Sequence, residues 1–147
     1  MQRTRLHESA GQRTYAVVLE TGEEVMDCLG RFVAEERIFA AQFTAIGAFS
    51  SVILGYFDWD RKDYLRNPVR EQVEVAAMIG DVAQDPAGSA ALHVHLVVGR
   101  RDGTAMAGHL VEGHVRPTLE VIMTESPAHL HKIKDPVSGL ALIRPNA

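Results

Sequence analysis

The apolar residues of the chain first follow a helical period. Behind Thr21-Gly22, apolar side chains recur at i, i+3, i+4, i+7 and i+8, at Val25, Cys28, Leu29, Phe32 and Val33. This spacing places them on one stripe of a helix that ends near Glu36, and it makes the lone cysteine a core residue. Thr21 and Glu24 match a capping box, which predicts that Thr21 caps the start of this helix.

The remaining apolar pattern predicts strands. Short apolar or alternating runs are separated by turn residues, and they occupy residues 15–20, 38–49, 51–57, 71–78, 91–99, 104–112, 118–123 and 140–143. The charged segment 58–69 contains Asn67-Pro68 and is predicted to be an exposed loop, as is segment 84–88. Because no crossover helices separate the later strands, the sheet must be mainly antiparallel. The expected fold is therefore α+β, with one principal helix packed on that sheet.

The polar residues 1–13 are expected to form a flexible N-terminus, and residues 14–147 a single domain. No run of apolar residues is long enough to cross a membrane, and the first residues lack the apolar core of a secretory signal. We therefore expect a cytoplasmic protein that makes no membrane contact. The single cysteine excludes an internal disulfide and a cysteine-based zinc site, and the net charge of −4 gives no general attraction to nucleic acid.

Three of the seven histidines fall within residues 93–110, HVHLVVGRRDGTAMAGHL. Residues two apart in a strand share a face, so His93 and His95 project together. The opposite face of this strand carries Leu92, Val94, Leu96 and Val98 and is wholly apolar. His109 lies beyond a turn, so its face depends on how the two strands pair.

Two turns fit the sequence between these strands. A two-residue turn at Asp102-Gly103 would point His109 into the apolar face. A three-residue turn at 101–103, with a left-handed Gly103, would set His109 opposite His95 and gather all three histidines on one face. The second pairing keeps the apolar face uniform, and a one-residue slip is costly where one face is buried. We therefore favour the three-residue turn.

Three converging imidazoles predict a metal site formed by His93, His95 and His109. Imidazole nitrogens bind zinc well and are also compatible with iron, nickel, copper or manganese. Three protein ligands leave a coordination position open, as in catalytic zinc sites, where a bound water becomes acidic. Asp81 follows the preceding strand and could orient one of the histidines from outside the ligand set. The sequence assigns no role to His114, His129 or His131.

The string LHVHLVV–RRDG–AGHLVEGHV, followed by TLEVIM, resembles the PPC (plants and prokaryotes conserved) domain family. The resemblance extends over nearly the whole chain, through TGEEVMDCLGRFVAEE and FTAIGAFSSVILGYFD. It implies a compact α+β domain assembled as a homotrimer, with a metal site at His93, His95 and His109. The family is often described as DNA-binding. However, the R-G-R-P hook with which its plant members contact DNA does not occur in this chain.

Two hypotheses of different classes follow. The first is a small trimeric PPC-like protein that binds a divalent metal, zinc in the first instance, and uses the site for a small ligand or for water activation. The second is a DNA-associated transcriptional regulatory domain, in which the metal is structural or incidental. The sequence names no substrate and does not decide whether the protein is an enzyme.

Overall fold

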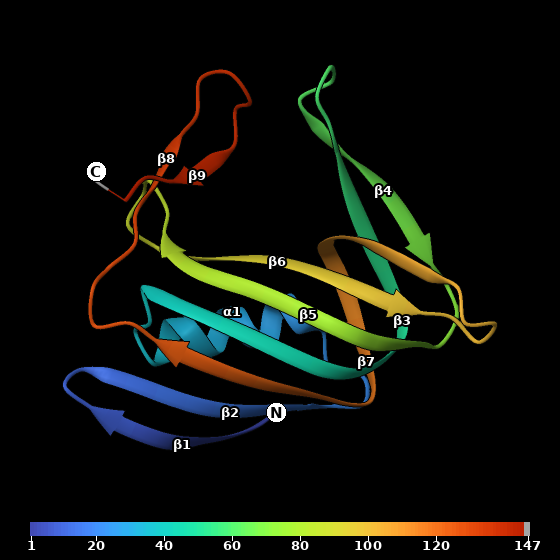
Figure 1. Ribbon diagram of the computed structural model, residues 1–147, viewed down its shortest axis with the longest axis horizontal. Helices are drawn as coiled ribbons and strands as arrows, with labels where there is room; N and C mark the ends of the chain where they lie inside the picture. Colours follow the sequence, from blue (N-terminus) through green and yellow to red (C-terminus); the bar gives the residue numbers. More distant parts are fainter. Residues whose placement is uncertain (146–147) are drawn as a thin grey trace.

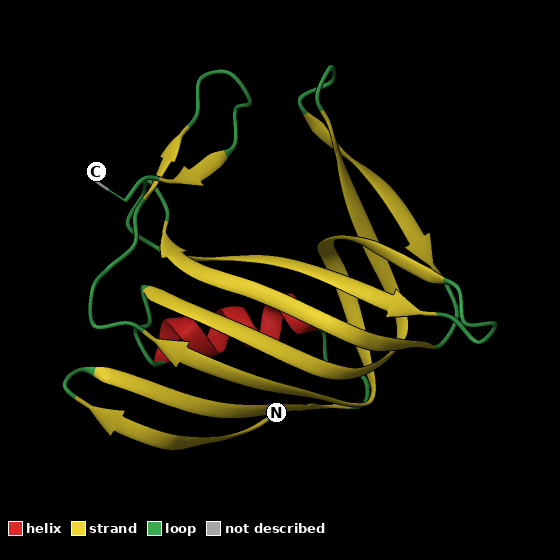
Figure 2. Cartoon of the chain, in the orientation of Figure 1, coloured by secondary structure: helices red, strands yellow, loops and turns green. Residues whose placement is uncertain are grey.

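The computed structural model describes residues 1–145, which form nine strands and one helix (Figures 1 and 2). In chain order the elements are β1 (Gln2–Ser9), β2 (Gln12–Glu20), α1 (Val25–Glu35), β3 (Ala40–Asp58), β4 (Asp63–Val69), β5 (Val73–Gln84), β6 (Ala90–Gly99), β7 (Ala105–Glu125), β8 (Lys132–Lys134) and β9 (Ala141–Ile143). The predicted combination of a mainly antiparallel sheet and a single helix is confirmed. In the part of the chain described, no helix has the length and hydrophobicity that crossing a bilayer requires.

Seven strands form one antiparallel sheet in the order β1-β2-β7-β6-β5-β3-β4, and β3 also pairs with β7. This extra pairing closes β3, β5, β6 and β7 into a barrel. The sequence divided β3 and β7 into two strands each, but each is one long strand that bends midway (Figure 1). Their mutual register shifts at three places between Gly47 and Leu54, and such bulges bend a strand without ending it.

Helix α1 packs behind the sheet (Figure 2), and all five residues of its predicted apolar stripe are buried. They join one core with the inward side chains of β2, β6 and β7, including Val17, Val94 and Leu119. The predicted cap is wrong. Glu24 is the N-cap, and its carboxylate accepts a hydrogen bond from the Asp27 amide at 2.7 Å. The Thr21 hydroxyl instead donates to the Pro117 carbonyl at 3.1 Å, which fastens the segment before α1 to β7.

Two segments expected to be irregular contain strands. Residues 2–9 form β1, which pairs with β2, and residues 63–69 form β4, which pairs with β3. Both are edge strands whose side chains are almost all exposed, so neither carries the apolar alternation by which a strand is recognised. The predicted strand at 140–143 is confirmed as β9, and its partner β8 was missed.

The hairpin that joins β6 and β7 has the predicted three-residue turn. The Arg100 amide donates to the Thr104 carbonyl at 2.8 Å, and Gly103 adopts a φ of +83°. The Asp102 carboxylate accepts hydrogen bonds from the amide and the hydroxyl of Thr104. His95 consequently lies opposite His109, as the buried apolar face predicted.

We predict that Gly103→Ala lowers the free energy of unfolding by about 1 kcal/mol, because alanine is strained at a left-handed φ. Gly99→Ala in the adjoining strand is the matched control, since a Cβ there meets no atom within 4 Å. Urea unfolding of both variants measures the difference. Equal stabilities would show that the turn does not require a left-handed residue.

Candidate metal centre

The three histidines of the predicted site share one face of the β6–β7 hairpin. His93 and His95 alternate along β6 with Val94 and Leu96, which are buried in the core. The pairing of His95 with His109 across the hairpin then places the third ring beside the first two. The burial of one face of β6 therefore determines that its histidines lie on the other.

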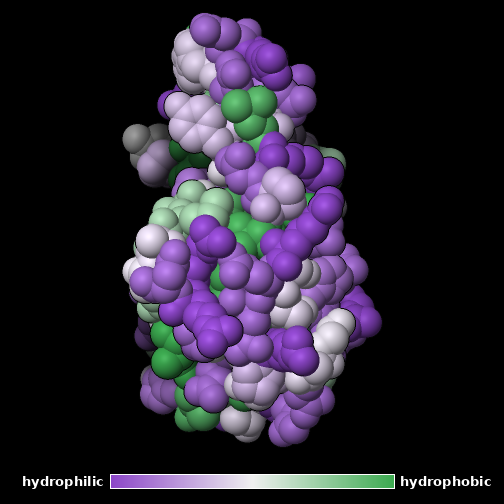
Figure 3. Space-filling view, turned by 90° about the vertical axis from the view of Figure 1, so that its right-hand side faces the viewer, coloured by the Kyte–Doolittle hydropathy of each residue, from purple (hydrophilic) through white to green (hydrophobic). Residues whose placement is uncertain are grey.

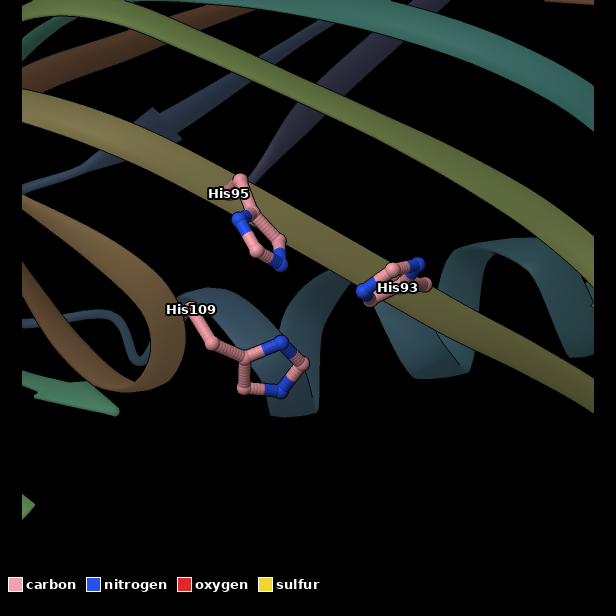
Figure 4. Close-up of side chains that lie close together, drawn as sticks. All are labelled: His93, His95 and His109. Atoms are coloured by element: carbon pink, nitrogen blue, oxygen red, sulfur yellow. The ribbon is translucent and has the colours of Figure 1, made fainter. Parts of the chain in front are cut away.

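The three rings converge on a common space (Figure 4). Their centroids lie 4.9 Å apart between His93 and His95, and 5.4 Å from each of these to His109. One ligand nitrogen from each ring lies within 4.8 Å of the others, which is close enough for all three to bind one ion. In the part of the chain described, no other group of three potential metal ligands comes this close together.

The surroundings favour the neutral form of His95 and His109. Burial, together with His93 and His95 nearby, lowers the pKa of His109 to about 4. Burial and His93 also lower the pKa of His95. Nδ1 of His109 is buried and has no hydrogen-bond partner. An unprotonated ring with a buried, unpaired nitrogen aimed at two other imidazoles is what a metal ligand requires, so these residues fit a divalent ion.

Asp81 lies beside a histidine of the cluster, as the sequence suggested, but within β5 rather than after a strand ending at Met78. Its Oδ2 faces Nδ1 of His93 at 3.3 Å, and its Oδ1 lies 3.3 Å from the ammonium of Lys132. Burial alone would raise the pKa of Asp81, but the contacts with His93 and Lys132 outweigh it and the pKa is lowered. Asp81 is therefore an anion at neutral pH that lies in contact with the His93 ring.

Comparison with known proteins identifies the fold and the family. The model of the Plants and Prokaryotes Conserved (PCC) domain matches residues 6–127. The chain belongs to this family, which is also abbreviated PPC. No protein of curated function matches the sequence.

Solved structures of similar proteins cover nearly the whole PCC domain. A Pyrococcus horikoshii plant- and prokaryote-conserved (PPC) protein is 28% identical, with a TM-score of 0.83 over 97% of this chain and 94% of that one. An Archaeoglobus fulgidus protein described as metal-containing is 28% identical, with a TM-score of 0.81 over 89% and 92%. A Ralstonia eutropha protein described as a "putative DNA-binding protein" is 29% identical, with a TM-score of 0.82 over 88% and 90%.

An aromatic ring that the sequence analysis missed lies against the histidine site of this PCC domain. Tyr64 of β4 stacks on His109, with ring centroids 4.7 Å apart and planes 28° apart. Gly55 of β3 makes this contact possible, because a Cβ there would lie 2.9 Å from Cδ1 of Tyr64. Tyr64 was missed because it stands in the segment that was predicted to be a loop.

A groove opens beside His93 and His95 on the face of the sheet away from α1. It has a volume of about 690 Å³ and is lined by Gln42, Phe43, Thr44, Ile79, Gly80, Asp81, His93, His95, Ile122 and Thr124. Most of the surface that lines the groove is apolar, although polar side chains also reach it. One of its apolar residues, Ile79, is 61% exposed to solvent. Most pockets that take small ligands combine an apolar lining with a few polar groups in this way.

The other histidines of the second half of the chain lie outside this cluster. His114 pairs through Nε2 with Glu112 at 2.9 Å, and neither residue joins the three-histidine group. His129 and His131 follow the end of β7, and their ring centroids lie 6.5 Å apart. None of these three histidines, which the sequence left without a role, belongs to the group formed by His93, His95 and His109.

We predict that Tyr64→Ala lowers the free energy of unfolding by about 1 kcal/mol more than Tyr56→Ala, because only Tyr64 stacks on another ring. Tyr56 is 66% exposed and lies one residue from Gly55, which makes it the matched control. Tyr64→Phe keeps the stacked ring and should restore the lost stability. Urea unfolding measures all three variants, and equal effects of the two alanine substitutions would contradict the role of the stack.

Proposed function

We propose that this PCC domain binds one divalent metal ion per chain through His93, His95 and His109, with zinc as the first expectation. The observation that carries the proposal is the convergence of the three imidazoles, one of which, His109, has a buried Nδ1 with no hydrogen-bond partner. The metal-containing Archaeoglobus relative supports it. A divalent ion held by three imidazoles would keep an open position, where it could acidify a water or polarise a ligand.

The groove beside the histidines is the proposed place for a small ligand. Its size suits a molecule of small-metabolite dimensions. Ile79 and Ile122 would contact the apolar part of such a molecule, while Thr44 and Thr124 offer hydroxyls to its polar part. The chain's own residues would in this way bind and orient a ligand next to the metal.

Association into a homotrimer, which the family resemblance implies, is part of the proposal. The open face of the sheet carries apolar side chains that are largely exposed in one chain, with Ile46 at 60% and Ile122 at 46%. Exposed apolar groups of this kind favour contact with another protein surface. A mass near three times 16.1 kDa in light scattering is the expected result.

DNA binding is the second candidate function, and the description of the Ralstonia relative favours it. The charges of this chain support it less well. The Arg100 guanidinium pairs with Glu71 and that of Arg61 lies near Asp58, so each of these cations already has a carboxylate beside it. Figure 3 shows the end of the molecule that carries the β3–β4 hairpin, where hydrophilic residues predominate.

Metal analysis tests the first function. Protein purified without nickel resin and loaded with zinc should retain about one ion per chain after desalting. His95→Ala should lose the ion because two imidazoles hold zinc weakly. His114→Ala should retain it, since His114 lies outside the cluster. Retention of zinc by His95→Ala, or loss in the wild type, would overturn the proposal.

Duplex DNA distinguishes the second function. Fluorescence anisotropy with a labelled duplex should show no binding at moderate salt, because a protein of net charge −4 gains little from counterion release. Tight binding with a steep dependence on salt concentration would instead favour the DNA-associated function. The same titration with metal-free protein would show whether the ion contributes.

A further inference from the structure

Lys132 of β8 is a buried lysine. It is 7% exposed, and among residues 1–145 it is the only lysine or arginine that is buried. Its neighbour on the same strand, Lys134, is exposed. An ammonium group loses its hydration when it is buried, so the structure must compensate the charge nearby.

The compensating charge is Asp81, which also contacts the histidine site. One carboxylate oxygen, Oδ1, lies 3.3 Å from Nζ of Lys132, and the other, Oδ2, lies 3.3 Å from Nδ1 of His93. Oδ1 is itself buried and accepts no hydrogen bond. The charge of Lys132 is therefore what stabilises this side of the carboxylate, while the other side remains directed at His93.

The backbone around β8 fixes the position of Lys132. The Gln84 amide at the end of β5 donates to the Leu130 carbonyl at 2.7 Å, and Gln84 and His131 form a parallel bridge. The Arg144 amide donates to the His131 carbonyl at 2.9 Å, which ties the β8–β9 hairpin to the same point. Figure 1 shows this hairpin at the end of β5. Lys132 also lies beyond residues 6–127, the part that the family model matches.

We propose that Lys132 is a positioning residue for the metal site and acts through Asp81 on His93. Its ammonium holds the carboxylate so that Oδ2 accepts the Nδ1 proton of His93, which leaves Nε2 of that ring free to bind the ion. The role rests on the proposed metal-binding function. Without the ammonium, Oδ1 is a buried anion with no partner, and the carboxylate turns away from His93 to reach water.

Zinc affinity, measured by competition with a chromogenic chelator, tests the role of Lys132. Lys132→Met should weaken zinc binding about 10-fold, the usual effect of losing a group that supports a ligand. Lys132→Arg keeps the charge and should restore most of the affinity. Lys134→Met, two residues away on β8 but exposed, should bind zinc as the wild type does.

A double-mutant cycle and a cobalt spectrum separate positioning from a merely structural effect. If Lys132 acts through Asp81, adding Lys132→Met to Asp81→Asn should weaken zinc binding no further. The visible absorption of the Co²⁺-loaded protein should shift in Lys132→Met and in Asp81→Asn but not in Lys134→Met. The neutral pair Asp81→Asn/Lys132→Met leaves no charge unpaired, so it remains informative if Lys132→Met alone folds poorly.

The outcomes distinguish this role from the proposed function. Wild-type protein that binds zinc while Lys132→Met binds it equally well, with an unchanged cobalt spectrum, would overturn the role of Lys132 alone. Additive losses in the cycle would also overturn it, because Lys132 would then act independently of Asp81. Wild-type protein that binds no zinc would overturn the proposed function and this role together.

Discussion

The candidate site depends on the register between β6 and β7. His95 and His109 lie on one face only because Val94, Leu96 and Val98 occupy the other and are buried there. A slip of one residue would exchange the two faces of a strand, exposing the apolar side chains and burying imidazoles in the core. The hydrophobic burial that folds the hairpin is therefore the same interaction that assembles the three histidines.

Closure of the barrel adds a second constraint on the site. Strand β3 runs beside β7 so closely that a Cβ at Gly108 would lie 2.8 Å from the Gly55 carbonyl oxygen. The absence of side chains at Gly55 and Gly108 allows this approach. The close approach of β3 to β7 also brings β4, the neighbour of β3, near enough for Tyr64 to stack on His109. The ring of His109 is thus held by its pairing with β6 on one side and by the stacked tyrosine on the other.

The sequence predicted those parts of the structure in which burial repeats at a regular interval. The stripe of α1, the alternating faces of β6 and the turn at Gly103 all follow from such patterns, and with them the convergence of the three histidines. Edge strands β1 and β4 are exposed on both faces, so no alternation marked them. The cap at Glu24 was missed because Thr21 and Glu24 also match the sequence pattern of a capping box that begins at Thr21. In the structure the Glu24 carboxylate caps the helix, and the Thr21 hydroxyl donates to the carbonyl of Pro117, which is distant in sequence.

The contacts that support the histidines could not be predicted for a related reason. Tyr64 approaches His109 from 45 residues away in sequence, and Lys132 reaches Asp81 from 51 residues away. Neither residue belongs to a periodic pattern that would reveal its partner. Asp81 was named because it follows the strand predicted at 71–78; the structure extends that strand to Gln84, so that Asp81 lies within β5 and pairs directly with His93 on β6. The proposed ligands thus come from a local hairpin, whereas the side chains that contact them come from β4 and β5, and Lys132 of β8 contacts Asp81 in turn. The geometry of the candidate site therefore depends on the complete tertiary fold.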